Sequence, residues 1–390
     1  MHDFDRIIDR RNTNSIKYDF AAKRGIPESA MPMWVADMDF RSPKEVIDAL
    51  AKVVEHGIFG YSEPGDDYYI AVCDWFREGF AFDVKPDWTV AAPGVVFALN
   101  MAIQAFTEHG DSVIIQSPVY YPFGHSVRDN GRRLIESSLA LKEGKYEMDF
   151  DDFEEKVKKS GAKLFILCSP HNPVGRVWTE KELACVGDIC MNYDVIVVSD
   201  EIHCDFAHPG HKHQIFGSIK DEFLARSITC TAPSKTFNLP GLHNANVFIA
   251  DKNLRRKYEN TIRATGLSQP NALGFVAGMA AYRHGRPWLY ELKAYIQENL
   301  SFARDFIAKR IPSVKLIEPE GTYLIWLDFR ELAKTDEEVE NIVLRKAGLW
   351  LDLGGIFGKE GHGFARMNIA CPKEIVRQAL VKLEAAVSML

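Results

Sequence analysis

The chain has 390 residues, of which 46% are hydrophobic, so it can bury the cores of about two or three domains. Its 47 basic and 54 acidic side chains give a net charge of -7, which argues against a nucleic-acid-binding surface or a polybasic membrane patch. The longest apolar runs have the length of strands and fall well short of the roughly 20 residues of a membrane helix. Because the N-terminus is charged and has no apolar signal region, we expect a cytoplasmic protein.

The seven cysteines are scattered along the chain, and no two of them form a C-x-x-C pair. Several stand in apolar runs, as Cys168 does in Phe-Ile-Leu-Cys. This distribution favours buried free thiols over disulfides, which agrees with a cytoplasmic location.

Residues 1–45 are rich in turn-forming residues and predict an ordered, irregular arm that belongs in part to a small domain. The arm contains the segment Met31-Pro-Met-Trp-Val-Ala-Asp-Met-Asp-Phe40. A helix is predicted directly after it, from Ser42-Pro43 through Val54, with Ser42 as its N-cap and Pro43 at its first position.

Residues 46–285 predict a large α/β domain, because short apolar runs alternate with amphipathic helices between about 88 and 250. The runs of Val, Ile and Leu lack polar alternation, which is typical of strands that are buried on both faces of a mostly parallel sheet. The seven predicted strands are 89–92, 112–116, 133–137, 163–168, 195–199, 227–231 and 246–250. The predicted helices include 95–106, 151–159, 179–193 and 217–223.

Residues 286–390 predict a smaller α+β domain. One long helical pattern runs roughly from 271 through 309, which would place the domain boundary near residue 285 inside a continuous helix. The predicted strands of this domain are 314–317, 323–329 and 365–369, and the predicted helices lie near 336–347 and 373–389.

Four polar segments follow predicted strands of the large domain, at the sheet edge where ligands bind in open α/β folds. Lys235 in Ser234-Lys-Thr-Phe is either a solvated loop residue or a Schiff-base lysine, which requires a site that lowers the pKa of its amine. Asp200 is either a helix N-cap or a carboxylate that keeps a pyridinium nitrogen protonated. Asn172 stands in a Pro-rich turn and could donate to a phenolate oxygen. Gly94 opens a helix whose backbone N–H groups could bind a phosphate.

The order of these segments, glycine–helix, N-P-x-G, D-x-x-H and then S-K, resembles the fold-type I enzymes that use pyridoxal 5′-phosphate (PLP), the aspartate aminotransferase superfamily. The resemblance spans nearly the whole chain. It implies the α/β fold of PLP-dependent transferases, with a mostly parallel seven-stranded sheet in the large domain. It also implies that Lys235 and Asp200 are catalytic, together with Tyr61, which would reach the cofactor phosphate of the neighbouring subunit of a homodimer. The implied cofactor-binding residues are Tyr61, Gly94, Val95, Val96, Tyr120, Asn172, Asp200, His203, Ser234 and Lys235.

Three further segments narrow the resemblance to the MalY/PatB-type carbon–sulfur β-lyases: the arm segment 31–40, Asp200-Glu-Ile-His203 and Ala232-Pro-Ser-Lys-Thr-Phe-Asn-Leu. This subfamily implies α,β-elimination from cystathionine or a related cysteine S-conjugate, which yields a thiol, pyruvate and ammonia. The implied substrate-binding residues are Val35, Ala36, Asn172 and Arg366, of which Arg366 would bind the α-carboxylate as a bidentate fork. The sequence leaves open which thioether or disulfide is the physiological substrate.

The chain departs from the wider superfamily at two positions. His203 stands where aminotransferases usually carry a tyrosine, and His243 stands where they carry an arginine that binds the phosphate. The second change predicts that backbone groups, hydroxyls and Tyr61 contribute more to phosphate binding, and Thr231 and Ser234 are both candidate hydroxyls.

Three other functions compete with the lyase. An aminotransferase would share Lys235, Asp200, Asn172 and Arg366, and only the arm segment and the two histidines favour the lyase over it. A metal-binding protein could carry the histidine-rich segment 203–213, but its spacing matches none of the usual zinc patterns, so we expect no metal. A regulatory protein could retain PLP, although nothing in the sequence marks a partner surface.

Overall fold

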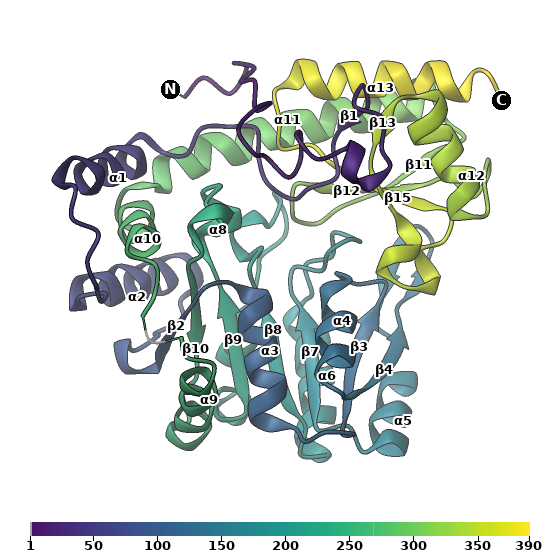
Figure 1. The fold of residues 1–390 in the computed structure, drawn as a ribbon. Coiled ribbons are helices and arrows are strands. Elements are labelled where there is room, and N and C mark those ends of the chain that lie inside the picture. Colours follow the sequence, from purple (N-terminus) through teal and green to yellow (C-terminus); the bar gives the residue numbers. More distant parts are fainter. Residues whose placement is uncertain (1, 268) are drawn as a thin grey trace.

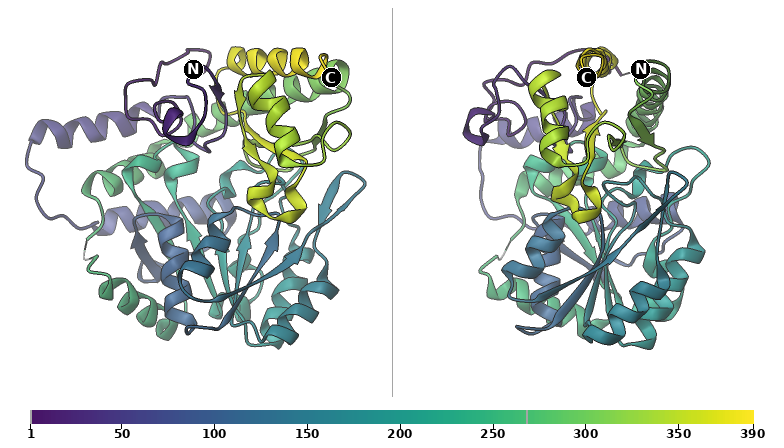
Figure 2. Two further views of the ribbon diagram at one scale, coloured as in Figure 1. Left: turned by 45° about the vertical axis from the view of Figure 1, so that its right-hand side comes forward. Right: turned by 90° about the vertical axis from the view of Figure 1, so that its right-hand side faces the viewer.

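The computed structural model describes residues 2–267 and 269–390 and has two layers of helices around one large sheet, with a smaller sheet above it (Figures 1 and 2). The large sheet has seven strands in the order β2-β10-β9-β8-β7-β3-β4. Only β10 runs antiparallel to its neighbours, so the predicted seven-stranded, mostly parallel sheet is confirmed. The strands are β2 (Thr89–Ala92), β3 (Ser112–Ser117), β4 (Arg133–Ser138), β7 (Leu164–Cys168), β8 (Ile196–Asp200), β9 (Ser227–Thr231) and β10 (Ala245–Phe248).

The sheet is buried on both faces because its central strands carry apolar side chains at successive positions. Leu164 and Ile166 of β7 pack into one apolar cluster, while Phe165 and Leu167 pack into another on the opposite face. The first cluster includes α3 (Val95–Phe106) and α9 (Lys252–Ala264), and the second includes α5 (Phe150–Ser160) and α6 (Glu180–Asn192). The sandwiched sheet thereby presents the carboxyl ends of its parallel strands at one edge.

The smaller sheet is antiparallel, in the order β11-β12-β15-β14, and it lies above that edge. Its strands are β11 (Lys315–Ile317), β12 (Leu324–Asp328), β14 (Asp352–Leu353) and β15 (Phe364–Asn368), and its helices are α11 (Arg286–Arg310), α12 (Asp336–Glu340) and α13 (Lys373–Val387). The predicted strands 314–317, 323–329 and 365–369 are therefore confirmed, whereas β14 was not predicted.

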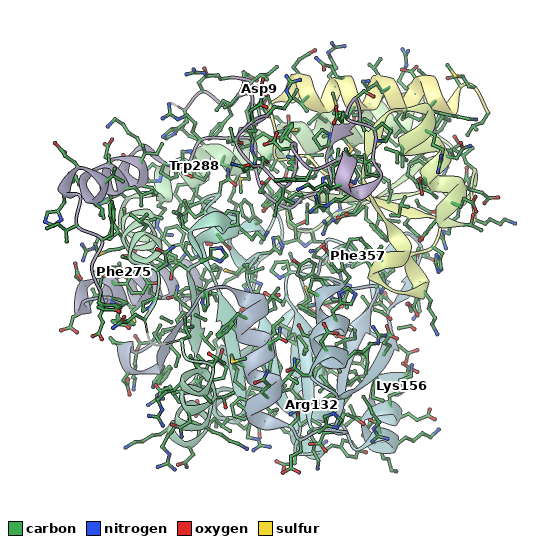
Figure 3. The ribbon with its side chains drawn as sticks, viewed as in Figure 1. Asp9, Arg132, Lys156, Phe275, Trp288 and Phe357 are labelled. Carbon is green, nitrogen blue, oxygen red and sulfur yellow. The ribbon has the colours of Figure 1, made fainter. Side chains whose placement is uncertain are left out.

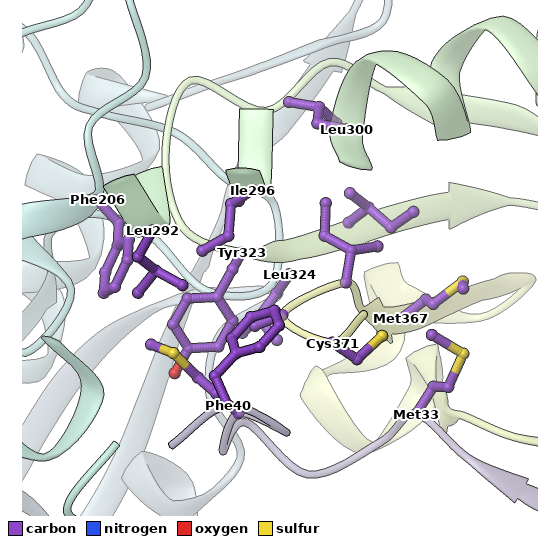
Figure 4. Packing of buried hydrophobic residues seen from close by; sticks show 14 of the residues in the cluster. Met33, Phe40, Phe206, Leu292, Ile296, Leu300, Tyr323, Leu324, Met367 and Cys371 are labelled. Atoms are coloured by element: carbon purple, nitrogen blue, oxygen red, sulfur yellow. The ribbon is translucent and has the colours of Figure 1, made fainter. Parts of the chain in front are cut away.

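The arm is attached to this smaller unit. Its strand β1 (Met31–Pro32) pairs in parallel with β13 (Leu349–Trp350). An apolar cluster then joins Met33 and Phe40 of the arm to α11, to β12 and to Tyr323 (Figure 4). The division into residues 46–285 and 286–390 stays a prediction.

Two predicted helices were wrong. The continuous helix 271–309 is in fact two helices, α10 (Ala272–His284) and α11, which meet at Gly285. Pro287 in the first turn of α11 has no N–H to donate to the preceding turn, which favours a new helix there. The helix predicted at 217–223 is a short 3₁₀ turn, Phe216–Ser218, followed by α7 (Asp221–Ala225).

The remaining helices are α1 (Lys44–His56), α2 (Asp66–Phe80), α4 (Pro122–Asp129) and α8 (Pro233–Thr236). The predicted N-cap of α1 is also wrong, because Pro43 holds that position. All seven cysteines are free and six are buried, while Cys185 is exposed. Within the described ranges, no helix is both long and apolar enough to cross a membrane.

Candidate active site

A cavity of about 350 Å³ lies at the carboxyl edge of the large sheet, where segments that follow several of its strands come together. Its wall is built by the ends of β7 and β8, by the residues that follow β2 and β3, by the first turns of α3 and α8, and by the arm. Ten of the residues predicted for the site line this one cavity: Ala36, Gly94, Val95, Val96, Tyr120, Asn172, Asp200, His203, Ser234 and Lys235.

Lys235 extends into the cavity from α8, a single turn that begins with Pro233 after β9. Burial lowers the pKa of its amine to about 8, against the opposing influence of the Asp37 carboxylate. The Nζ atom donates to the carbonyl oxygen of Ala36 at 2.7 Å. Lys235 therefore has the lowered basicity that a nucleophilic or proton-accepting amine requires near neutral pH.

Asp200 is the last residue of β8 and faces the same cavity. Burial raises the pKa of its carboxyl to about 7, while the Ile202 N–H and the charge of Lys235 lower it. The Ile202 N–H donates to its Oδ1 atom at 3.1 Å. Because few neighbouring groups stabilise the charge of this buried carboxylate, a cation in the cavity would favour its ionised form.

His203 lies one turn after Asp200 and is also buried in the cavity wall. Burial lowers the pKa of its imidazole to about 3, and the charges of Lys235 and Arg366 lower it further, so the ring is neutral. Its Nδ1 atom is buried and has no hydrogen-bond partner among the described residues. Its ring packs edge-on against Tyr323, with centroids 5.9 Å apart.

Arg366 lies on β15 of the smaller sheet, just outside the cavity wall, and is joined to it through Asn172. Its Nη1 atom donates to Oδ1 of Asn172 at 2.9 Å, and its Nη2 atom donates to the carbonyl oxygen of Trp34 at 3.0 Å. The guanidinium carbon lies 4.9 Å from the ring centre of Phe357, which is found between the smaller sheet and the large sheet (Figure 3). These contacts hold the Arg366 guanidinium against Asn172, which lines the cavity.

The arm closes the cavity through its backbone. Asn368 of β15 donates its side-chain amide to the carbonyl oxygens of Val35 and Asp37, both at 2.6 Å, and its backbone N–H donates to the carbonyl oxygen of Met33 at 2.8 Å. These bonds attach the arm to the smaller sheet.

Other residues of the site bind the remaining carbonyl groups of arm residues 33–38. Arg366 binds that of Trp34, and the carbonyl oxygen of Ala36 accepts from Lys235 and from the hydroxyl of Tyr323, the latter at 3.1 Å. Asn238, three residues after Lys235, accepts from the Met38 N–H at 3.0 Å and donates to the Met38 and Phe40 carbonyl oxygens, both at 2.9 Å. Every carbonyl oxygen from Met33 to Met38 thus accepts a bond from outside the segment.

Three predicted residues are not in the cavity wall. Tyr61 is 96% exposed on the connection between α1 and α2, so it contributes nothing to the cavity of its own chain. Val35 instead lines an adjoining cavity of about 630 Å³, which shares Ala36, Lys235, Pro240 and His243 with the first. Arg366 is the third, and it lies behind Asn172 on β15.

Ser234 and Thr231, the two hydroxyl residues predicted as candidates for phosphate binding, lie in different surroundings. Ser234 lines the cavity, whereas the hydroxyl of Thr231 donates to the carbonyl oxygen of Asn246 at 3.2 Å. His243, which replaces the arginine of aminotransferases, also lines the cavity and is exposed.

The histidine-rich segment has other contacts. Both ring nitrogens of His208 face backbone carbonyl oxygens, and His213 binds Glu201 at 2.7 Å. In residues 2–267 and 269–390, no three side chains of the metal-binding types gather as a candidate site.

Sequence reasoning missed Asn238, Tyr323 and Asp352, which hold the arm or Arg366. The arm is irregular, so its pattern does not show which distant residues would bind its backbone. The pairing of Asp352 with Arg366 depends on a two-residue strand that is too short to give a periodic signal.

The model of the family described as aminotransferase class I and II matches residues 31–383, so the chain belongs to this family. Cystathionine beta-lyase PatB of Bacillus subtilis (strain 168) is 43% identical over 385 residues, covering 99% of this chain and 100% of the relative. Protein MalY of Escherichia coli (strain K12) is 31% identical over 385 residues, covering 98% of each chain.

Solved structures agree with these relatives. Cystalysin from Treponema denticola, a structure that contains a pyridoxal 5′-phosphate cofactor, matches with a TM-score of 0.96 and 36% identity, covering 100% of this chain and 99% of that one. The PLP-bound C-S lyase from Staphylococcus hominis, in its external aldimine form with L-cycloserine, matches with a TM-score of 0.93 and 33% identity, covering 99% of this chain and 98% of that one.

Proposed function

We propose that the chain is a PLP-dependent carbon–sulfur β-lyase that cleaves cystathionine or a related cysteine S-conjugate to a thiol, pyruvate and ammonia. The observation that carries the proposal is that half-buried Lys235, whose amine has a pKa of about 8, and buried Asp200 line the same cavity. The full-length similarity to cystathionine beta-lyase PatB and to a C-S lyase supports it.

The residues of the cavity fit PLP. Lys235 supplies an amine for the aldehyde, and Asp200 supplies the carboxylate that a pyridinium nitrogen needs. The phosphate would be held by the N–H groups at the start of α3, at Gly94–Val96, and by the hydroxyl of Ser234. Tyr120 would cover the ring, and Asn172 and His203, whose Nδ1 has no hydrogen-bond partner among the described residues, would offer polar groups to it. When bound, the cofactor supplies an electron sink for the bonds at Cα of an amino acid.

The chain's own residues then perform the proton transfers and the orientation. Arg366 and Asn172 bind the substrate α-carboxylate, which selects the Cα bond that is broken. The free amine of Lys235 removes the Cα proton, because its lowered pKa leaves a useful fraction unprotonated near neutral pH. A thiolate leaves from Cβ, since thiols with a pKa of about 8.5 are adequate leaving groups. The arm, held at Val35 and Ala36, covers the substrate.

The closest alternative is an aminotransferase, which uses the same core residues. Cystathionine supplied alone separates the two, because a lyase forms pyruvate without an added keto acid and a transaminase does not. The Lys235→Ala variant is the control and should lose turnover while it remains folded. If the wild-type protein forms pyruvate only when a keto acid is added, the lyase proposal is wrong. A panel of β-thio amino acids with pyruvate detection would then rank cystathionine, cystine, cysteine and other conjugates.

We further propose a homodimer in which Tyr61 reaches the cofactor phosphate of the neighbouring subunit. The support is local: Tyr61 is exposed, and the same segment exposes Ile58 at 71% and Phe59 at 67%, which is costly for an unpartnered surface. Sedimentation of the wild-type protein would give the stoichiometry. Mixing inactive Lys235→Ala with inactive Tyr61→Ala subunits should restore up to about a quarter to a half of the active sites.

We also propose a cytoplasmic location. The support is the set of seven free thiols, since an oxidising compartment favours disulfides. Cell fractionation with an antibody against the chain would test this location.

A further inference from the structure

Asp352 lies beside the arginine proposed to bind the substrate carboxylate. In the ladder between β14 and β15, Asp352 is directly opposite Arg366, so both side chains extend from the same face of the smaller sheet. The carboxylate of Asp352 accepts a hydrogen bond from Nη2 of Arg366, and both residues are buried, at 8% and 3% exposed. The sequence patterns and the comparisons assign no role to Asp352.

The donors of Arg366 show what this pairing does. A guanidinium has five N–H groups, of which Nη2 carries two. Both are in use, since Nη2 donates to Asp352 and to the carbonyl oxygen of Trp34. Nη1 donates once, to Asn172, and Nε is buried without a hydrogen-bond partner in the described part of the chain. The donors left for a ligand are therefore on Nη1 and Nε, and the one beside the cavity is on Nη1, next to Asn172.

The pairing also restricts the motion of the side chain. Arginine has several rotatable bonds, and the contact with the Phe357 ring at 4.9 Å constrains only the tilt of the guanidinium plane. Nη2 donates a hydrogen bond to Asp352 on the strand directly opposite, and this bond adds to those with Trp34 and Asn172 in restricting rotation within that plane. The negative charge of Asp352 also stabilises the guanidinium in its buried position.

We propose that Asp352 is a positioning residue that holds the Arg366 guanidinium so that Nη1 faces the cavity and the substrate carboxylate. The inference rests on the proposed function, because it takes Arg366 as the carboxylate-binding group. Asp352 does not touch the substrate, and it acts through Arg366 alone.

The test measures carboxylate binding separately from catalysis. Calorimetry with the PLP-loaded protein gives the Kd of 3-(methylthio)propanoate, which carries a carboxylate but no amine and cannot react. Asp352→Val removes the acceptor and suits a strand, and we expect it to raise this Kd at least tenfold. Asp352→Asn retains an oxygen that can accept from Nη2 and should stay within threefold of wild type. Glu318→Ala, which breaks the distant surface pair with Arg304, is the matched control and should leave the Kd unchanged.

Steady-state kinetics with cystathionine supply a second readout that a general loss of structure would not reproduce. Asp352→Val should raise KM in the same proportion as the Kd, while kcat stays within about threefold. If Asp352→Val does not give folded, PLP-loaded protein, Asp352→Ser replaces it, because the shorter side chain does not reach the guanidinium.

The outcomes separate this inference from the proposed function. If Arg366→Gln weakens carboxylate binding and the Asp352 variant does not, the role of Asp352 is refuted and that of Arg366 stands. If Arg366→Gln leaves the Kd unchanged, the proposed role of Arg366 is refuted, and the inference fails with it. If Asp352→Asn is as defective as Asp352→Val, the charge rather than the hydrogen bond matters, and positioning is refuted.

Discussion

Replacing Asn238 by glycine should release the arm from the lysine-bearing loop while the rest of the fold is kept. The side chain makes three bonds to the arm backbone, one with the Met38 N–H and one with each carbonyl oxygen of Met38 and Phe40. Arg10 also donates to the Met38 carbonyl oxygen, so the N–H of Met38 and the carbonyl of Phe40 are the groups left without these partners. A hydrogen bond contributes about 0.5–1.5 kcal/mol, and an unsatisfied buried group costs more, so we expect a local loss of about 2–3 kcal/mol.

Hydrogen exchange measures this loss directly, because local opening exposes the arm amides without unfolding the domain. A loss of about 2–3 kcal/mol corresponds to exchange about 30- to 150-fold faster in peptides that cover residues 33–40. Glycine is the informative substitution because Asn238 has a φ of 58°. Asn238→Ala would add the cost of a left-handed backbone, about 1–2 kcal/mol, which affects overall stability.

The control is Asn12→Gly, which changes another arm asparagine with a positive φ, of 62°, and should leave exchange in residues 33–40 at the wild-type rate. Because the arm covers the site, Asn238→Gly should also raise KM for cystathionine. Wild-type exchange rates for residues 33–40 in Asn238→Gly would refute the reasoning, since the arm would then be held by the smaller sheet alone.

Three further predictions concern charged groups. In the cofactor-free protein, Lys235 should react with an amine-selective reagent with a midpoint near pH 8, because burial lowers its pKa; a midpoint above pH 10 would contradict this. Burial raises the pKa of Asp200 to about 7, so its contribution to cofactor-free stability is complete below pH 4 and is lost as the pH rises through 7. Asp200→Asn should therefore be more stable than wild type above pH 7 by a few kcal/mol, and equal denaturation midpoints at pH 8.5 would exclude this. Glu320→Ala should destabilise the protein by about 1.5–3 kcal/mol, because Arg176, 2% exposed, loses one of its two carboxylate partners and keeps only Glu182. Chemical denaturation would test this beside Glu374→Ala, which removes an exposed ion pair.

The strands were predictable because their apolar runs are contiguous and their ends carry turn residues. All seven strands of the large sheet appear within two residues of their predicted bounds. The polar residues at their carboxyl ends, such as Asp200 and Lys235, could be placed in one cavity for the same reason. Parallel strands bring the residues that follow them to one edge, whatever their distance along the chain.

The errors and omissions have physical causes. Hydrophobic periodicity continues through Gly285, so it does not reveal that α10 and α11 are separate. The side chains that hold the arm are polar residues whose partners are backbone atoms, and backbone atoms leave no mark in a residue pattern. Tyr61 was assigned by resemblance, and the structure of a single chain leaves it exposed, so its role stays a prediction.

The way in which the arm is held has a consequence for redesigning the pocket. Carbonyl oxygens of residues 33–38 receive the anchoring bonds, and every amino acid carries that oxygen. Side chains at Val35 and Ala36 can therefore be exchanged without removing an anchor. A library confined to these two positions would vary the shape of the substrate enclosure on a scaffold whose attachment does not depend on the residues chosen.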